Sequence, residues 1–208
     1  MRRGPGRTQW AAITAVALAL LFAGGAVTVA SAERDEAPRT PATDSADAGF
    51  ARDMSVHHQQ AVEMSFVVRD RTGDESVRRL AYDIANTQAN QRGMMLGWLD
   101  MWGLPKLQSG VEPMTWMGMG TGGGADGALM PGMATNAQMD ALRKASGREA
   151  EVLYLKLMTE HHKGGVHMAQ GCVQKCAPGV ERDLAQGMVD AQQSEILLMA
   201  DMLRKRGA

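Results

Sequence analysis

The stretch Met54-Ser55-Val56-His57-His58, followed by Met64, returns as Met158-Thr159-Glu160-His161-His162, followed by Met168. The offset between equivalent residues is constant at 104 positions (158 − 54 and 168 − 64), and the two stretches hold four of the five histidines. An α-helix turns by about 100° per residue, so each pattern falls on a stripe about 120° wide on one helix face. We therefore expect two helices whose stripes face each other and bring four imidazoles and four thioethers together.

The same offset continues beyond the histidines without a gap. The matching pairs include Leu80 and Leu184, Gln88 and Gln192, Met95 and Met199, and Leu99 and Leu203. Apolar positions in both halves recur at helical spacing, and no segment shows the sustained alternation of a strand. The sequence therefore predicts an all-α fold, in which two αα-hairpins from one duplicated unit, joined by a long crossover, form a four-helix bundle.

Four long helices are expected at about 50–71, 75–102, 148–170 and 180–206, with Asp47 as the N-cap of the first. Residues 103–147, rich in glycine and methionine, form the crossover, with a short helix that begins at Thr135 or Asn136. The bundle domain then covers residues 49–208, with repeats at about 50–102 and 148–206. Residues 33–48 mix Pro, Ala, Asp and Thr without apolar periodicity, which predicts a disordered linker.

Residues 1–32 have the composition of a signal peptide. Arg2, Arg3 and Arg7 precede an uncharged run from Trp10 to Ala30, and Ala30-Ser31-Ala32 is a small-x-small cleavage site. The uncharged run is nearly long enough to span a bilayer, so an uncleaved membrane anchor is the alternative. Either interpretation predicts an exported protein that is periplasmic, secreted or held at the cell surface, with membrane contact only through this segment.

The charge of the chain argues against one class of partner. The formal net charge is −1, and residues 33–208 hold 19 basic and 23 acidic groups, a net of −4. A mildly acidic domain without a basic run is not expected to bind nucleic acid.

The donor types in the two stripes indicate copper. Thioethers select copper over harder ions, and imidazole suits both Cu(I) and Cu(II). Zinc accepts histidine but gains little from methionine, so zinc is the weaker candidate. Ferritin-type di-iron sites need Glu-x-x-His, which does not occur in the chain. The expected metal ligands are Met54, His57, His58, Met64, Met158, His161, His162 and Met168.

Three functions fit these residues. The first is a copper-binding protein that buffers, stores or transfers the ion, with another copper-handling protein as a candidate partner. The second is a helical interaction module in which the histidines form a structural polar core, and the third is a copper-dependent redox enzyme. Because the stripes contain neither a nucleophile–base pair nor paired carboxylates, we expect no enzyme, and copper binding leads.

Further residues have candidate roles around the stripes. Residues on the partner helices could orient the imidazoles: Gln88, Met95, Gln192, Glu195 and Met199. The crossover methionines either capture Cu(I) weakly or pack on the bundle: Met114, Met117, Met119, Met130 and Met133. Cys172 and Cys176 are expected to form a local disulfide, with a thiolate copper site as the second interpretation.

These motifs resemble the bacterial domain-of-unknown-function family 305, which pairs Met-x-x-His-His-x-x-Ala-x-x-Met helices with Gln-x-x-Glu-x-x-x-Met helices. The resemblance covers residues 50–102 and 131–204. Gly165 stands at the motif alanine of the second repeat, and Gln91 replaces the motif glutamate of the first. The resemblance implies a ferritin-like fold, and some members of the family are described as exported copper-binding proteins.

The export signal gives a direct prediction. N-terminal sequencing of the exported protein is expected to begin at Glu33, because Ala30-Ser31-Ala32 provides the cleavage site. A protein recovered from the membrane fraction with residue 1 or 2 at its N-terminus would show an anchor instead.

Overall fold

The computed structural model describes residues 40–120 and 124–208. The predicted signal or anchor, and residues 33–39 of the predicted linker, lie outside the described residues. Within the described ranges the ordered elements are all helical, which confirms the predicted fold class. None of the helices in these ranges is both long and apolar enough to cross a lipid bilayer.

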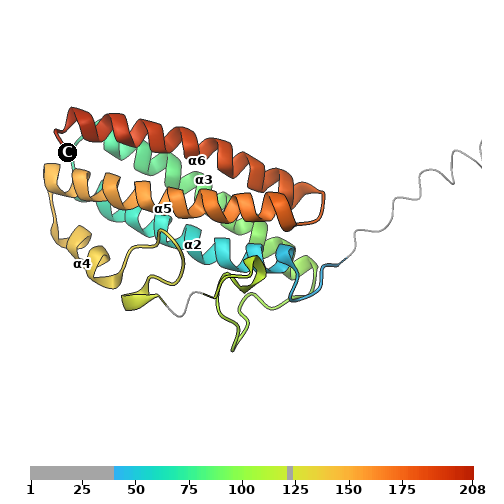
Figure 1. The fold of residues 1–208 in the computed structure, drawn as a ribbon. Helices are drawn as coiled ribbons and strands as arrows, with labels where there is room; N and C mark the ends of the chain where they lie inside the picture. Colours follow the sequence, from blue (N-terminus) through green and yellow to red (C-terminus); the bar gives the residue numbers. More distant parts are fainter. Residues whose placement is uncertain (1–39, 121–123) are drawn as a thin grey trace, which may run out of the picture. The chain divides into compact units, whose positions relative to one another are not determined.

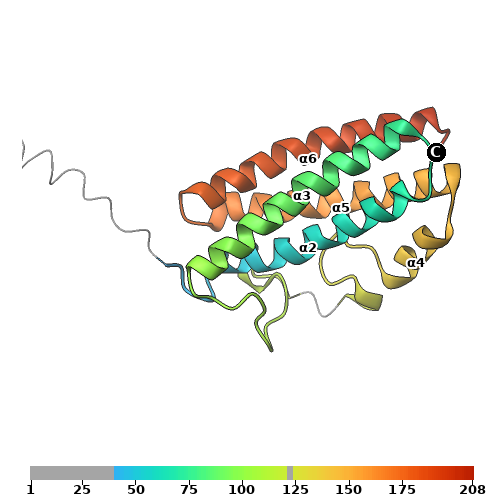
Figure 2. The same ribbon diagram turned by 180° about the vertical axis from the view of Figure 1, so that it is seen from behind.

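Four long helices make the bundle: α2 (Ala46–Arg69), α3 (Glu75–Met101), α5 (Gly147–Lys175) and α6 (Val180–Lys205). α2 pairs with α3, α5 pairs with α6, and α2 packs against α5. Figure 1 shows α5 and α6 in front, and Figure 2 shows α3 and α2 from behind. The crossover carries η1 (Thr115–Met117), η2 (Ala125–Gly127) and α4 (Asn136–Lys144) along one side of the bundle. The ferritin-like bundle of two hairpins and a long crossover is therefore confirmed.

The first helix begins earlier than the sequence predicted. Ser45 caps α2, because its hydroxyl accepts a hydrogen bond from the Ala48 amide at 3.2 Å. Asp47, the predicted cap, lies in the first turn, and its carboxylate accepts from the Ala177 amide at 3.0 Å. The helix start at Ala46 and the fully buried Ala48 show that the last residues of the predicted linker belong to the bundle.

The other boundaries follow local capping chemistry. Asp74 caps α3, and Thr135 caps α4 in a capping box with Gln138. α5 continues to Lys175, five residues beyond the expected end near Gln170. The extension brings Cys172 and Cys176 into the interior, at 0 % and 1 % exposure.

Methionines of both repeats divide between two buried clusters. One cluster contains Met64, Met158 and Met199, and the other contains Met54, Met95 and Met168. Each set combines one residue of each stripe with one residue of a partner helix, and an offset of 104 converts one set into the other. The paired histidines follow Met54 and precede Met64 on α2, between one cluster and the other.

The crossover is held against α2 and α5 by close backbone contacts. Gln60 forms two hydrogen bonds with the Ala134 backbone, at 2.6 and 2.8 Å. A Cβ atom at Gly164 would lie only 1.9 Å from the Pro131 carbonyl oxygen, so glycine is required where the crossover passes over α5. This approach brings the Pro131 carbonyl oxygen to the buried side chain of His57 on α2.

Two helical glycines provide a matched test of that approach. Gly164→Ala is expected to reduce the free energy of unfolding by about 2 kcal/mol or more, because the new methyl group overlaps the crossover backbone. Gly187→Ala, an exposed position in α6 with open space around it, is expected to stabilise by about 0.5–1 kcal/mol through helix propensity. Urea unfolding of both variants measures the difference, and equal effects would contradict the packing of the crossover.

Candidate metal centre

The two stripes lie in the interior of the bundle. All four histidines of the stripes have 0 % exposure, and so do the four stripe methionines. Buried imidazoles need hydrogen-bond partners, since an unpaired polar group in the interior costs free energy. The hydrogen-bond partner of each ring determines which nitrogen is protonated and which is free to ligate.

The inner pair, His57 and His161, is held by backbone carbonyls. The Nε2 of His57 lies 3.2 Å from the Pro131 carbonyl oxygen. The Nε2 of His161 lies 2.9 Å from the His57 carbonyl oxygen. A carbonyl oxygen only accepts hydrogen bonds, so both rings must carry a proton on Nε2.

The second pair, His58 and His162, is held by side chains of the partner helices. The Nε2 of His58 lies 2.8 Å from Gln91 Oε1 on α3, and the Nε2 of His162 lies 2.7 Å from Glu195 Oε2 on α6. Both bonds join residues 33 positions apart, so they are equivalent in the two repeats. Each acceptor again places the ring proton on Nε2.

The other ring nitrogen of every buried histidine is left without a partner. Nδ1 is fully enclosed and unpaired in His57, His58, His161 and His162. With Nε2 protonated, a neutral ring carries a lone pair on Nδ1. Metal-binding histidines have this arrangement, with one nitrogen donating to an oxygen while the other is free to ligate. The four rings therefore fit a soft or borderline metal ion.

The rings do not converge on a single point. The centroids of His57 and His161 are 3.8 Å apart, whereas His57 and His58 are 6.5 Å apart and His161 and His162 are 6.3 Å apart. Within the described residues, no three of these histidines bring ligand atoms within 4.8 Å of one another. The arrangement thus argues against one site of three or four imidazoles.

Burial keeps three of the rings neutral. It lowers the pKa of His57 to about 4, and burial together with the neighbouring His57 lowers the pKa of His58 to about 3. The pKa of His161 is also well below its ordinary value, chiefly because of burial. Neutral imidazole is the form that ligates, so these rings are ready to bind metal across the physiological pH range.

Two of the residues expected to orient the imidazoles do not contact them by hydrogen bonds. Gln88 is 2 % exposed with both amide atoms unpartnered, and Gln192 Oε1 is also unpartnered. Of the predicted set, Glu195 contacts a ring, while Met95 and Met199 lie in the two buried clusters.

Gln91 was missed as a contact, although the offset of 104 from Glu195 points to it. Pro131 was missed because it contributes only its backbone carbonyl.

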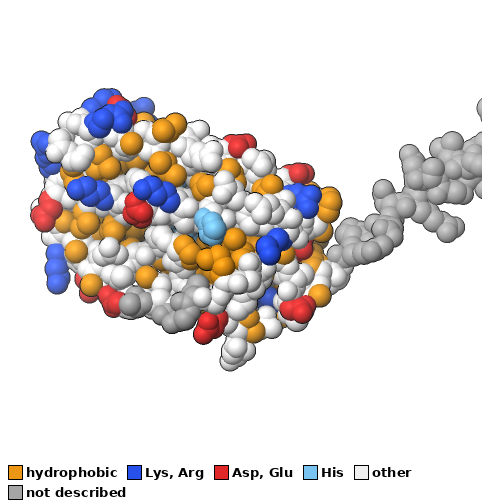
Figure 3. Space-filling view, in the orientation of Figure 1, with side chains coloured by type: hydrophobic (Ala, Val, Ile, Leu, Met, Phe, Trp, Pro, Cys, Tyr) orange, Lys and Arg blue, Asp and Glu red, His pale blue; other side chains and the backbone are white. Residues whose placement is uncertain are grey.

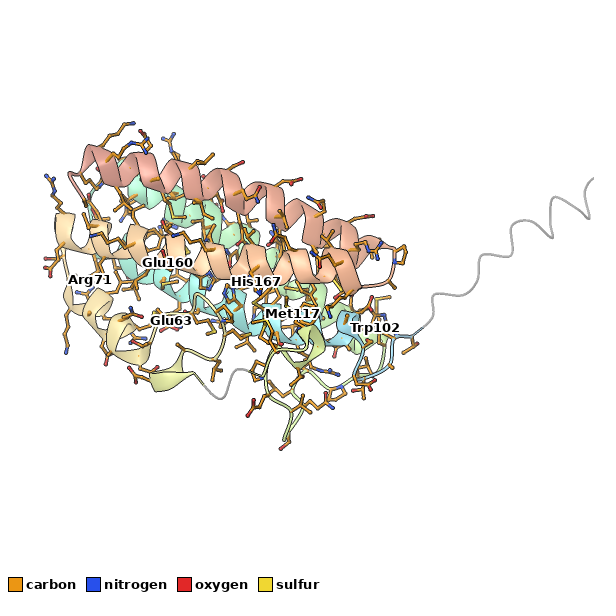
Figure 4. All side chains as sticks on the ribbon, in the orientation of Figure 1. Glu63, Arg71, Trp102, Met117, Glu160 and His167 are labelled. Carbon is orange, nitrogen blue, oxygen red and sulfur yellow. A yellow bond between two sulfur atoms is a disulfide. The ribbon has the colours of Figure 1, made fainter. Side chains whose placement is uncertain are left out.

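The crossover methionines are dispersed. Met114 and Met130 are buried in the core, Met117 and Met133 are half-buried, and Met119 is exposed. Figure 4 labels Met117 beside His167, the exposed histidine of α5. Figure 3 shows the histidine of this face next to hydrophobic side chains. The four stripe histidines are buried and do not reach the surface. The crossover methionines thus mainly pack on the bundle.

Cys172 and Cys176 are joined by a disulfide at the C-terminal end of α5. The sulfur atoms are buried rather than placed at a frayed helix end. This site lies apart from the histidine pairs in sequence and has no equivalent in the first repeat, where Val68 and Thr72 stand.

The protein is a four-helix bundle with one histidine–methionine stripe on α2 and one on α5. Comparison with known proteins shows which family it belongs to. The model of the domain of unknown function DUF305 matches residues 47–203. The chain belongs to the DUF305 family. No curated protein matches the chain at a significant level.

Several solved structures share the fold. A DUF305 protein from Streptomyces coelicolor, described as a candidate secreted protein, is 69% identical, with 80% of this chain and 97% of that chain covered and a TM-score of 0.75. A DUF305 fragment from Deinococcus radiodurans is 30% identical, with 77% and 96% covered and a TM-score of 0.63. CopM in its Cu(I)-bound form is 20% identical, with 76% and 96% covered and a TM-score of 0.58, a likeness of fold.

The depressed histidine pKa values predict acid sensitivity of the metal-free protein. Unfolded histidines take up protons below about pH 6.5, whereas folded His57 does so only near pH 4. The unfolded state therefore binds more protons in this window, and stability falls as pH falls, by about 1 kcal/mol per pH unit for each such ring. Urea unfolding at pH 7.5 and pH 5.5, with chelator present, measures the loss.

The variant His57→Gln/His161→Gln is expected to lose most of this pH dependence. His167→Gln, at an exposed position on α5, serves as the control and should retain it. An unchanged pH slope in the double variant would show that these two rings are not buried as neutral groups.

Proposed function

We propose that the protein binds copper outside the cytoplasm and buffers, stores or transfers it. The ligands are the Nδ1 atoms of His57, His58, His161 and His162, together with the thioethers of Met54, Met64, Met158 and Met168. The single observation that carries the proposal is the set of four enclosed, unpaired Nδ1 atoms whose rings are each anchored through Nε2. Binding of more than one ion would satisfy these atoms, because the rings do not converge on a single point.

The same observation favours metal binding over a purely structural histidine core. A structural core would be expected to pair both nitrogens of each ring, because each unpaired buried polar atom costs about 1–3 kcal/mol. Here one nitrogen of every ring is paired and the other is not. The unpaired Nδ1 atoms thus support the proposal that these rings bind an ion.

The thioethers support copper over zinc. Each buried cluster supplies two stripe methionines, one from α2 and one from α5, and a third methionine from α3 or α6. Cu(I) accepts thioether and imidazole together, and Cu(II) accepts imidazole. The shared fold with CopM, solved in Cu(I)-bound and Cu(II)-bound forms, is consistent with this choice.

Residues 1–32 are proposed to direct export, either as a cleaved signal peptide or as an uncleaved membrane anchor. The Streptomyces coelicolor relative, described as a candidate secreted protein, agrees with the signal-like residues 1–32. Because the histidines have 0 % exposure, exchange of copper with another copper-handling protein requires part of the bundle to open, and we propose that the crossover moves. The Pro131 carbonyl on His57 and the Gln60 bonds to Ala134 are the contacts that would open.

Copper titration of matched variants tests the proposal. His57→Ala/His58→Ala and His161→Ala/His162→Ala are each expected to weaken tight copper binding by at least about tenfold, because each removes two of the four imidazoles. Met54→Leu/Met168→Leu, which conserves volume, is expected to weaken Cu(I) more than Cu(II). Competition with a chromophoric chelator under anaerobic conditions measures the affinities.

Two controls make the experiment decisive. His167→Gln and Met119→Leu change exposed donors, so they are expected to leave tight binding unchanged and remove only weakly bound ions. Because burial keeps the pKa of His57 at about 4, tight binding is expected to persist to pH 5.5. Full retention of tight copper by a variant that lacks all four stripe histidines would overturn the proposed function.

A further inference from the structure

A second group of ligand-type atoms lies at the end of the bundle where α2 begins and α5 turns into α6 (Figure 1). A carboxylate oxygen of Asp47, a carboxylate oxygen of Glu181 and the sulfur of Cys176 all lie within 4.8 Å of one another. Glu181 is only 5 % exposed, and neither of its carboxylate oxygens has a hydrogen-bond partner. A buried, unpaired carboxyl group beside a second acid is costly for the folded chain unless a proton or a cation accompanies it.

The repeat provides an internal comparison for this group. Asp47 corresponds to Glu151 in the other repeat, and Cys176 corresponds to Thr72. At the opposite end of the bundle, the Thr72 hydroxyl donates to Glu151 at 2.6 Å, and Arg206 donates to the same carboxylate at 2.7 Å. There, the chain supplies its own cation.

At the α5–α6 end, an uncharged residue stands where the other end has Arg206. The residue equivalent to Arg206 is Trp102, which Figure 4 labels at this end of the bundle. The residue equivalent to Glu181 is Val77, so this end gains an acid as it loses an arginine. In the ranges that the structure describes, neither Asp47 nor Glu181 pairs with a lysine or arginine.

The neighbouring arginine does not compensate the two acids. Arg182 donates both of its hydrogen bonds to the Cys176 carbonyl, at 2.6 and 3.0 Å. Burial and the charge of Asp47 raise the pKa of Glu181 to about 9, so a proton occupies this carboxyl group near neutral pH. A divalent cation could displace that proton if enough ligands were present.

The disulfide controls the ligand count. With Cys172 and Cys176 bonded to each other, the group offers two carboxylates and no thiolate. The geometry points to a second metal site, of thiolate–carboxylate type, that forms when this disulfide is reduced. It takes a divalent cation of the zinc class through Cys176, Glu181 and Asp47, whose ligand atoms already lie together, and the thiolate of Cys172 released from the disulfide is the fourth ligand. This site is independent of the histidine stripes, and neither proposal requires the other.

The redox step and the binding step both balance. A dithiol donor supplies two electrons and two protons, becomes a disulfide itself, and leaves Cys172 and Cys176 as thiols. A divalent cation then displaces the two thiol protons and the proton of Glu181, since thiols bind metal as thiolates. Zinc accepts both sulfur and carboxylate oxygen in tetrahedral sites, and the N-terminal turns of α2 and α6 favour negative charge at this place.

Co²⁺ is the probe that tests this inference on the full chain. A tetrahedral thiolate site gives a sulfur-to-Co²⁺ charge-transfer absorption that imidazole and thioether sites lack, so the histidine stripes do not interfere. The oxidised protein is expected to show no such absorption. After reduction with a phosphine, one Co²⁺ per chain is expected to give the absorption, and Zn²⁺ is expected to abolish it.

Variants identify the ligands. Glu181→Gln and Asp47→Asn are each expected to weaken Co²⁺ binding at least tenfold, whereas Glu160→Gln, an exposed acid on α5, should have no effect. Cys172→Ser/Cys176→Ser should lose the absorption but retain copper binding at the stripes. The inference is overturned if the reduced protein shows no absorption although alkylation counts two free thiols. It is also overturned if Glu181→Gln and Asp47→Asn both bind Co²⁺ as tightly as the wild-type protein. Loss of the helical circular-dichroism signal on reduction, without recovery on addition of Zn²⁺, would overturn it as well.

Discussion

The hydrogen bond from Nε2 of each buried histidine is the interaction on which the rest of the structure depends. Four imidazoles can lie in an apolar interior only if their ring protons find acceptors, and each acceptor comes from a different residue. Two are backbone carbonyls, of Pro131 and His57, and two are side chains on the partner helices, Gln91 and Glu195. The helix pairing, the crossover and the ring tautomers are therefore linked, and the unpaired Nδ1 atoms follow from that linkage.

The crossover makes the surroundings of His57 and His161 unequal in the two repeats. His161 donates to the carbonyl of His57, whereas His57 donates to Pro131 rather than to the carbonyl of His161. Gly164 permits this by allowing the Pro131 backbone to approach α5. The crossover thus completes the histidine layer as well as joining the hairpins. Equivalent sequence stripes lead to related but unequal environments, and the two halves of the centre need not bind copper equally.

The fold could be predicted from the sequence because the 104-residue offset and helical periodicity repeat over long segments. Side-chain partners were harder, since helix spacing fixes the face of a residue but not which rotamer reaches a ring. Gln88 was therefore favoured over Gln91, which makes the contact. The Pro131 carbonyl and the approach of Asp47 to Glu181 depend on backbone paths and long-range packing that no local pattern encodes.

Long-range ¹⁵N–¹H NMR of the histidine side chains tests the central claim most directly. In the metal-free protein at pH 7, the account predicts that all four stripe histidines carry a proton on Nε2, as their oxygen acceptors require, and that His57, His58 and His161 are neutral rings. Addition of Ag⁺, a diamagnetic analogue of Cu(I), should then shift the Nδ1 resonances while each Nε2 keeps its proton. Rings protonated at Nδ1, or a Ag⁺ response confined to the exposed His167, would contradict the account.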